Sequence, residues 1–524
     1  MKKVLLMLVA CIAAVNVSAQ DVTGLMGWEK SFTPVADKDN LAGVHTAIAS
    51  DGSIYVSSTY DQAIDFAGLS LAAPEENLLS SIIFKTNKDG VGQWAVTFFG
   101  ACTINAMTTD TDGTLYVAGK VTDEKVVLTS TDNTQKEITN PKAYDIMADA
   151  EVVSGYSAFV AMISKEGVCQ SVKVVSPSKV IPDDLMTFDP SAITPTKIVV
   201  DGDKVYVSCA FGGNVEELGW EGSYLNMDYW MGQDLKSYGL FSLAKADLTG
   251  LTSVAKLQRN PLVATYAEGL QEDLQNTPDA FNFGVYNGTP VMTFIGWGDL
   301  KLTTGNTSKD FSFAVANDGT GMNEHAMVCV NGSADLSMIF HAEKHEKSYV
   351  PYNLIGGDFV DGYSYFGGTF YGNFPLDNTV TKDKNTSFVA SIKMSDCSVN
   401  WAMANEVESE AKCMVVTGEE IHAATADALY TFRTSNGELK ATDTQHGYED
   451  ADAYKDECVS TVYTKDNAVW INVPYMNPSG INETKALKNG AAKYYNLNGV
   501  EVSAPQKGLN IIKTTDGVKK VTVK

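Results

Sequence analysis

The sequence has 524 residues, 44% hydrophobic and 20% charged, so the chain can bury a large core and is not disordered throughout. Its 39 Lys and Arg residues stand against 64 Asp and Glu, a formal net charge of -25. This balance argues against nucleic-acid binding, because phosphate contacts require a surplus of Lys and Arg, and against a general affinity for anionic membranes. The 43 Gly, 23 Tyr and 21 Phe favour a protein of strands and turns.

The N-terminus has the pattern of a secretory signal peptide over residues 1–19. A charged Lys2-Lys3 pair precedes an apolar run over 4–15, and Val17-Ser18-Ala19 supplies a cleavage site. The run is too short to span a bilayer, and nothing comparable follows it, so no transmembrane segment is expected. We expect an exported protein that is either surface-exposed or released. A periplasmic protein and a lipoprotein anchored at Cys11 are the alternatives.

A tight turn followed by a short β-rich strand recurs along the chain. The clearest copies are Asp51-Gly52-Ser53-Ile54-Tyr55-Val56, Asp112-Gly113-Thr114-Leu115-Tyr116-Val117 and Asp201-Gly202-Asp203-Lys204-Val205-Tyr206-Val207. Weaker copies are Asn287-Gly288, Asp361-Gly362, Gly418-Glu419 and Asp466-Asn467. Each copy predicts two antiparallel strands joined by a turn in which Gly or Asn accepts a positive φ.

A second hairpin follows several of these copies. The runs over 81–98, 158–174, 387–402 and 429–440 each read as two strands around a turn. Four antiparallel strands in a unit of about 50–90 residues match a propeller blade in size and content. The fold class is therefore all-β, and we predict a β-propeller over residues 21–478. We count seven blades, with six or eight as the alternatives.

An isolated strand near the N-terminus predicts how the ring closes. Gly27-Trp28-Glu29-Lys30-Ser31-Phe32 looks like a fourth strand that lacks a preceding three. The last repeat, over 458–475, shows two clear strands and no good fourth strand. The N-terminal strand would complete this last blade and remove the exposed edges that an open array would leave.

These residues resemble the bacterial β-propeller repeat called SBBP. That repeat runs through a D-x-x-G-x-x-Y-V hairpin, a D-F segment and a G-x-x-x-W segment. Asp51 to Val56, Asp65-Phe66, Gly90 and Trp94 match it in order. The second unit matches it in part, and the third, fourth and sixth units depart from it. The resemblance implies a propeller in an exported bacterial protein and implies no particular activity.

The composition changes at Ser479, and residues 479–524 form a separate piece. This tail has eight Lys against three acidic residues and reads as a hairpin over 493–502 followed by strands over 505–512 and 517–524. It is similar to the C-terminal domains of exported Bacteroidetes proteins, which in many members are type IX secretion sorting signals. The resemblance implies the outer-membrane secretion machinery as a partner. The alternative is a small β-module that caps the propeller.

Metal and cofactor sites are not predicted. Seven cysteines remain after the signal, an odd number at wide spacing and without C-x-x-C, so we expect no zinc cluster and mostly buried thiols, with one or two long-range disulfides as the alternative. Asp110-Thr111-Asp112-Gly113 resembles a calcium loop, but a hairpin turn accounts for it better. Structural calcium at blade junctions remains an alternative for which the sequence names no ligands.

No catalytic residue is predicted, because the sequence has no sialidase-type Asp box, nucleophile elbow or glycosidase pair that can be singled out. The long insertion of the third unit instead combines aromatic and polar side chains, which suits a sugar or peptide face. The candidate ligand-binding residues are Trp220, Tyr224, Asp228, Tyr229, Trp230 and, on the same face, Trp297. The alternative is that the insertion folds back and buries its rings over the blade.

The expected function is that of a non-catalytic binding or interaction protein of the cell envelope, with a carbohydrate or a protein as ligand. The rival hypothesis is a propeller-based enzyme, a hydrolase or lyase acting on glycans. Propeller active sites gather residues from several blades, so the lack of a local motif does not decide between the two.

Overall fold

We describe a computed structural model of the chain. The structure describes residues 27–75, 78–145, 150–152, 155–178, 192–222, 237–259, 277–286, 288–297, 299–312, 325–331, 337–342, 354–374, 376–395, 398–444, 447–454, 458–473, 493–495, 501–502, 508–514 and 517–523. The chain divides into two compact units, one over Gly27–Pro474 and the other containing the C-terminal residues from Tyr475. The predicted signal peptide and Cys11 lie outside the described residues.

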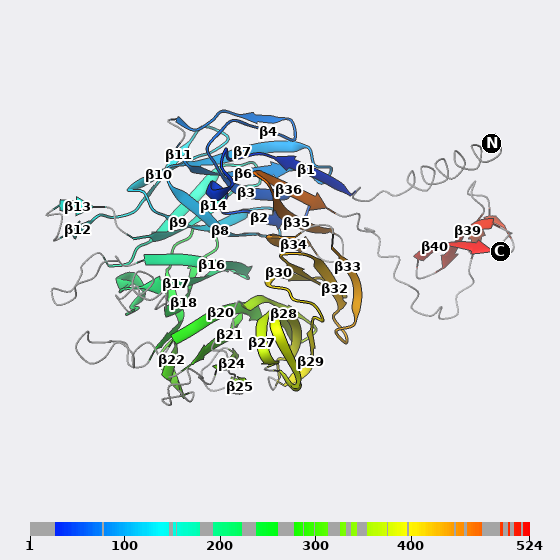
Figure 1. Cartoon of the computed structure of the whole chain (residues 1–524). Coiled ribbons are helices and arrows are strands. Elements are labelled where there is room, and N and C mark those ends of the chain that lie inside the picture. Colours follow the sequence, from blue (N-terminus) through cyan, green and yellow to red (C-terminus); the bar gives the residue numbers. More distant parts are fainter. Residues whose placement is uncertain are drawn as a thin grey trace. The chain divides into compact units, whose positions relative to one another are not determined.

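The larger unit is a ring of antiparallel sheets, so the prediction of an all-β propeller is confirmed (Figure 1). Its described strands form seven larger sheets, five of four strands and two of six, and two further sheets of two strands each. Sheet 1 has β2 (His45–Ile48), β3 (Ile54–Tyr60), β6 (Ser80–Thr86) and β7 (Gly92–Phe99). Sheet 2 has β8 (Cys102–Thr109), β9 (Leu115–Val121), β14 (Ser157–Ile163) and β15 (Cys169–Val175). Sheet 3 has β16 (Ala192–Asp201), β17 (Lys204–Gly212), β18 (Ser237–Ala244) and β19 (Thr252–Arg259).

The remaining sheets follow the same order. Sheet 4 has β20 (Thr277–Tyr286), β21 (Thr289–Trp297), β24 (His325–Asn331) and β25 (Ser337–Ala342). Sheet 5 has β26 (Leu354–Val360), β27 (Tyr363–Phe374), β28 (Asp377–Lys393) and β29 (Val399–Ala404). Sheet 6 has β30 (Ala411–Val416), β31 (Glu420–Thr425), β32 (Leu429–Arg433) and β33 (Leu439–Asp443). Sheet 7 has β34 (Asp450–Tyr454), β35 (Cys458–Lys465), β36 (Ala468–Val473) and β1 (Trp28–Phe32).

The first strand of each sheet lies innermost in the ring. Contacts run from β2 to β8, β16, β20, β26, β30 and β34 in turn and return from β34 to β2. The middle strands are covered by the neighbouring sheets on both faces, and every residue of β3, β6 and β14 is accordingly buried. Because both faces of these strands lose water, their sequences are near-continuous apolar and small-polar runs instead of strict alternations.

The N-terminal strand closes the ring, as the sequence predicted. Strand β1 pairs with β36 antiparallel, from Trp28 opposite Val473 to Phe32 opposite Val469. Phe32 is 3% exposed, and its ring centroid lies 4.9 Å from that of Phe66 and 5.2 Å from that of Phe84 in sheet 1. The closure therefore joins the two ends of the ring by strand pairing and by a small aromatic cluster.

Three interfaces between neighbouring sheets share a contact that we call the indole latch. A Trp on the fourth strand of one sheet donates its indole N–H to a carbonyl in a turn of the next sheet, and its ring covers the Gly of that turn. The pairs are Trp28 with Lys88 O at 2.9 Å and Gly90, Trp94 with Lys165 O at 2.9 Å and Gly167, and Trp401 with Thr434 O at 3.1 Å and Gly437. The latch gives a physical reason for the G-x-x-x-W segment, since Gly90 receives one indole and Trp94, four residues on, supplies the next.

Two inserted hairpins differ from the prediction of four strands in every unit. Strands β10 (Lys125–Thr129) and β11 (Gln135–Thr139) follow β9 in sequence, yet β10 pairs with β7 and extends sheet 1. Strands β22 (Asp299–Thr304) and β23 (Thr307–Ser312) likewise extend sheet 3 through β19. Each insertion thus covers the outer edge of the preceding sheet, which reduces the exposed hydrogen-bonding edge.

One predicted turn has a different place in its sheet. Six of the seven turns join the first and second strands, whereas Asp466-Asn467 joins β35 to β36, the second and third strands of sheet 7. Asp466 has a φ of 56°, so the turn residue itself takes the left-handed conformation that Gly supplies elsewhere. The sequence pattern identified the turn but not its position in the sheet.

Smaller elements complete the described fold. Strands β4 (Ile64–Phe66) and β5 (Leu69–Leu71) form a hairpin that contains the D-F segment, and β12 (Ala143–Asp145) pairs with β13 (Ala150–Val152). Short 3-10 helices occupy Lys38–Asn40 (η1) and Glu216–Leu218 (η3). No helix within the described ranges is long and apolar enough to cross a membrane.

The C-terminal unit contains its own antiparallel sheet, in the order β38-β37-β39-β40. Its strands are β37 (Lys493–Tyr495), β38 (Glu501–Val502), β39 (Gly508–Thr514) and β40 (Gly517–Val523). The predicted hairpin and the two following strands are therefore present in the tail.

Candidate binding site at the ring closure

Among the predicted ligand-binding residues, Trp220 lies in the core of sheet 3. Its side chain is 1% exposed, its ring stacks on Phe211 at a centroid distance of 4.9 Å, and its indole N–H donates to Ser253 Oγ at 2.7 Å. Gly239 makes room for the ring, because a Cβ at that position would overlap the indole. Trp220 is thus a packing residue of sheet 3.

The side chains of the other predicted site residues are not among those that the structure describes. Tyr224, Asp228, Tyr229 and Trp230 lie outside the described residues. Trp297 ends β21 opposite Thr277, and its side chain also lies outside the described part of the chain. The structure does not bring these residues together with Trp220 in any described contact.

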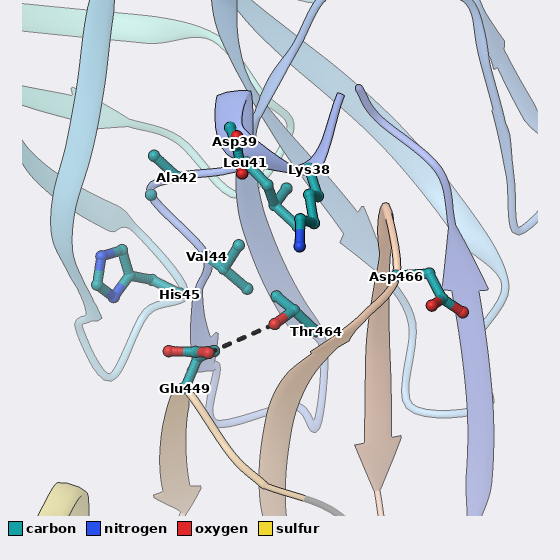
Figure 2. Close-up of a pocket in the computed structure, with 10 residues that line it drawn as sticks. Lys38, Asp39, Leu41, Ala42, Val44, His45, Glu449, Thr464 and Asp466 are labelled. Atoms are coloured by element: carbon teal, nitrogen blue, oxygen red, sulfur yellow. Dashed lines mark hydrogen bonds between the residues drawn. The ribbon is translucent and has the colours of Figure 1, made fainter. Parts of the chain in front are cut away.

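A different site is present where the first and last sheets meet. We call the first of its two hollows the closure cavity; it has a volume of about 490 Å³ and lies beside the loop between β1 and β2 (Figure 2). Its lining residues are Lys38, Asp39, Leu41, Ala42, Gly43, Val44, His45, Glu449, Thr464 and Asp466. This lining comes from residues 38–45 and from residues 449–466. The two segments are about 400 positions apart in the sequence and meet only because the ring closes.

Local contacts fix the loop that forms one wall of the closure cavity. The Asp37 carboxylate accepts the Asp39 N–H at 3.1 Å and caps η1. The Ala42 N–H donates to Thr59 Oγ1 at 2.9 Å, and the Thr59 N–H donates to the Ala42 carbonyl at 2.9 Å. The wall is therefore held against β3 by paired hydrogen bonds.

His45, which lines the closure cavity, lies beside a carboxylate that is not part of the lining. His45 Nδ1 lies 3.2 Å from Asp450 Oδ2, and both side chains are about one-quarter exposed. The same Asp450 oxygen accepts the Thr46 N–H at 3.1 Å. Also in the lining, Thr464 Oγ1 donates to Glu449 Oε1 at 3.4 Å (Figure 2).

Two carboxylates of β34 link the last sheet to the first by accepting backbone N–H groups of β2. Asp450 accepts from Thr46, and two residues on, Asp452 Oδ2 accepts the Ile48 N–H at 2.8 Å. The spacing of two places both side chains on the same side of β34. Burial first, and then the neighbouring charges of Asp450 and Asp358, raise the pKa of Asp452 to about 7.

Other inner strands are joined by side chains in the same manner. Lys197 Nζ donates to the Phe283 carbonyl at 2.7 Å and also to the Gly356 carbonyl, which connects β16 to β20 and β26. Asn282 Nδ2 donates to the same Gly356 carbonyl at 3.1 Å. Burial lowers the pKa of Lys197 and raises that of Asp358, while the attraction between their charges opposes both shifts. These groups are engaged in hydrogen bonds within the scaffold.

The second hollow, which we call the Trp470 cavity, lies on the other side of the β35–β36 turn. Its volume is about 570 Å³, and Thr33, Lys465, Asp466, Asn467, Ala468 and Trp470 line it. Asp466 lines both hollows. The ring of Trp470 stacks on Tyr463 at 5.9 Å with an interplanar angle of 10°, and the Tyr463 hydroxyl donates to Glu29 Oε1 at 2.8 Å.

The lining of the two hollows supplies hydrogen-bond donors, acceptors and one aromatic ring. In the described part of the chain, no cluster of three His, Cys, Asp or Glu side chains is arranged to hold a metal ion. Cys102, Cys169, Cys209 and Cys413 are free thiols, and burial raises the pKa of each.

The sequence offered only a weak signal for this site. The Asp466-to-Trp470 segment was identified as a turn and a strand, and His45, Glu449 and Thr464 have no motif around them. A polar turn followed after three residues by a Trp is the one local hint. The sequence could not show that this turn lines a cavity, because the cavity also needs Thr33, which follows β1.

Neither the protein families nor the curated proteins with which the sequence was compared include a match. The resemblance to the SBBP repeat therefore remains a resemblance. Solved structures similar to the chain include BamB from Moraxella catarrhalis, at 11% identity over 85% of this chain and 98% of that chain, with a TM-score of 0.32.

Two further similar structures cover most of the chain. Quinohemoprotein alcohol dehydrogenase from Comamonas testosteroni has 11% identity over 89% of this chain and 78% of that chain, with a TM-score of 0.37. The Dos1 propeller has 7% identity over 86% of this chain and 94% of that chain, with a TM-score of 0.39. On its own strand topology, this chain is an all-β propeller with a polar, aromatic-edged site at the closure of the ring.

Proposed function

We propose that this protein is an exported propeller, with each of the seven sheets acting as one blade, that binds a ligand at the ring closure without converting it. The observation that carries the proposal is the pair of adjoining hollows, which are lined by side chains of positive and of negative charge and by the ring of Trp470. Rigid sheets with short, hydrogen-bonded walls suit binding, because little ordering is needed when the ligand arrives.

The polar surface of the closure cavity, and the charged side chains beside the more apolar surface of the Trp470 cavity, support a hydrophilic ligand. Lys38 and Lys465 supply cationic donors, and Asp39, Glu449 and Asp466 supply anionic acceptors. A carbohydrate or a polar protein segment meets such a lining with hydrogen bonds, whereas an apolar ligand would leave these groups unpaired.

An array experiment tests the proposal. The purified exported protein is applied to glycan and host-protein arrays, together with Glu449→Gln, Asp466→Asn and the control Asp89→Asn, which changes an exposed turn residue of sheet 1. We expect a specific ligand to be retained by the control and weakened by the two site variants. A ligand held equally by all four proteins would move the site away from the ring closure.

A catalytic role is the second candidate, and one observation favours it. His45 lines the closure cavity and forms a close pair with Asp450 behind the lining, and a carboxylate beside an imidazole is a common arrangement for a general base. Turnover of an arrayed glycan that disappears in His45→Ala would favour a hydrolase or lyase over a binding protein.

The proposal also includes the route to the cell exterior. The N-terminal pattern supports export, and the similarity of residues 479–524 to Bacteroidetes sorting domains supports delivery to the surface or medium through outer-membrane secretion machinery. A periplasmic location and a lipid anchor at Cys11 are the alternatives that fractionation distinguishes.

A further inference from the structure

The five tryptophans whose side chains the structure describes divide into two groups. Four of them donate the indole N–H to a protein acceptor: Trp28, Trp94, Trp220 and Trp401. Trp470 is half-buried, and its indole N–H makes no hydrogen bond to any described residue. Because a buried Trp N–H normally finds a partner, an unused indole donor beside a cavity is available to a ligand.

The ring of Trp470 is a fixed platform. Tyr463 lies nearly parallel to it, and the Tyr463 hydroxyl is held by Glu29 of the closing strand β1. Strand pairing on both sides also fixes the backbone, with Trp470 opposite Tyr463 in β35 and Ser31 in β1. A ligand that stacks on this ring therefore costs little additional ordering of the protein.

Polar groups surround the platform within the same cavity. Lys465 and Asp466 form no ion pair with a described residue, so both retain their full capacity for a ligand. Asn467 Nδ2 donates to the Ala36 carbonyl at 2.6 Å, which orients the amide and leaves its oxygen as an acceptor. Thr33 adds a hydroxyl that can donate or accept.

This combination matches the chemistry of a neutral sugar. A pyranose ring presents an apolar C–H face that packs on an aromatic ring, and its hydroxyls pair with carboxylate, amide, ammonium and hydroxyl groups at the rim. The charges of Lys465 and Asp466 balance, so the lining favours neither an anionic nor a cationic ligand. Ala468 is the one aliphatic residue in the lining, so Trp470 is its one large apolar side chain.

We propose that the Trp470 cavity is a carbohydrate-binding site for a neutral glycan, with the indole of Trp470 as the stacking platform and Asp466, Asn467 and Lys465 as hydroxyl partners. The inference rests on the proposed binding function and specifies its ligand and its central residue. The volume of the Trp470 cavity, about 570 Å³, lies within the usual range of small-ligand sites.

The first test measures glycan affinity in solution. Neutral oligosaccharides selected on the array are titrated by calorimetry into wild type, Trp470→Ala, Asp466→Ala and the control Asp89→Ala. We expect each of the two site variants to lose about tenfold or more in affinity, the effect of one lost stacking or charge-assisted contact, and the control to be unchanged. Unchanged affinity in Trp470→Ala with an unchanged unfolding midpoint would overturn the inference.

A second measurement follows binding in wild-type protein, so it does not depend on whether a truncated variant folds. In wild-type protein labelled with 5-fluorotryptophan, the resonance of Trp470, assigned with Trp470→Phe, is followed by fluorine NMR during the titration. We expect it to shift in proportion to the bound fraction, while the Trp94 and Trp401 resonances, which belong to indole latches, stay in place. A saturated complex with no shift at Trp470 would contradict the proposal.

The outcomes separate this inference from the proposed function. Neutral-glycan binding that survives Trp470→Ala but is lost in Glu449→Gln supports the binding function and places the sugar in the closure cavity, which overturns the inference. Binding of peptides only would also overturn the inference while leaving a binding protein. Absence of any ligand of either class would contradict the proposed function itself.

Discussion

Trp94 and Gly167 lie on neighbouring sheets, and the indole ring lies so close to the glycine that a Cβ there would be 2.9 Å from the ring atom Cδ2. The indole N–H donates to the carbonyl of Lys165 in the same turn at 2.9 Å. Gly167 also has a φ of 86°, a conformation that L side chains adopt at a cost. The glycine is thus required twice, once for the turn and once for the indole latch.

Replacing this glycine separates the two requirements. Gly167→Ala is expected to lower the free energy of unfolding by about 2 kcal/mol or more, because backbone strain adds to displacement of the Trp94 ring and of the Thr131 methyl group, which lies nearest to the new Cβ. Gly202→Ala is the matched control, since Gly202 also has a positive φ, 58°, and no atom lies within 4 Å of its Cβ position. Urea unfolding of both variants measures the difference, and equal losses would show that the latch contributes nothing to stability.

The closing strand is expected to hold the ring together. Phe32→Ala should cost about 3–5 kcal/mol, because the buried ring leaves a cavity beside Phe66 and Phe84. Ser31→Ala on the same strand is the control, since Ser31 is exposed and its loss should change stability by less than about 0.5 kcal/mol. Thermal unfolding followed by circular dichroism compares the two. A similar midpoint for both variants would mean that the ring does not depend on β1.

The carboxylate of Asp452 is expected to make stability depend on pH. Its pKa is raised from 3.8 to about 7 in the folded protein. Between these two pH values the folded state therefore keeps a proton that the unfolded state releases. The stability that it contributes is fully present below about pH 4 and is lost as the pH rises through about 7. Asp452→Asn keeps an oxygen that accepts the Ile48 N–H but cannot ionise.

The measurement is urea unfolding at several values of pH. Relative to Asp452→Asn, wild type should lose up to about 1.4 kcal/mol of unfolding free energy per pH unit between about pH 4 and 7. Asp89→Asn, which changes an exposed carboxylate, should follow the wild-type curve. Parallel curves for wild type and Asp452→Asn would mean that Asp452 ionises in the folded protein as an ordinary Asp does.

The tail is expected to direct the exported protein to the surface or the medium. Truncation before Ser479 should leave the propeller in the periplasm, because the ring closes within Gly27–Pro474 and does not require the tail for strand pairing. A Cys11→Ala variant distinguishes a lipid anchor, since only a lipoprotein would lose its membrane attachment. Fractionation and immunoblotting follow both variants, and identical location and processing of full-length and truncated protein would rule out a sorting role.

The hairpins, the repeat and the strand that closes the ring could all be predicted from the order of residues. Asp51-Gly52 and Asp112-Gly113 specify tight turns because few residues accept their backbone angles, and this preference is local. The orphan strand around Trp28 was recognisable because a strand without neighbours must pair somewhere, and the last repeat, over 458–475, showed two clear strands and no good fourth strand. Local chemistry was enough for these features.

The tertiary structure decided the features that depend on distant residues. The hairpin over 125–139 extends the sheet before it, and Trp220 is buried while Trp470 lines a cavity, although each is simply an aromatic residue in the sequence. The meeting of His45 with Asp450 and the raised pKa of Asp452 arise only when the ring closes. Burial and the field of neighbouring charges act through space, so neither could be read from the order of residues along the chain.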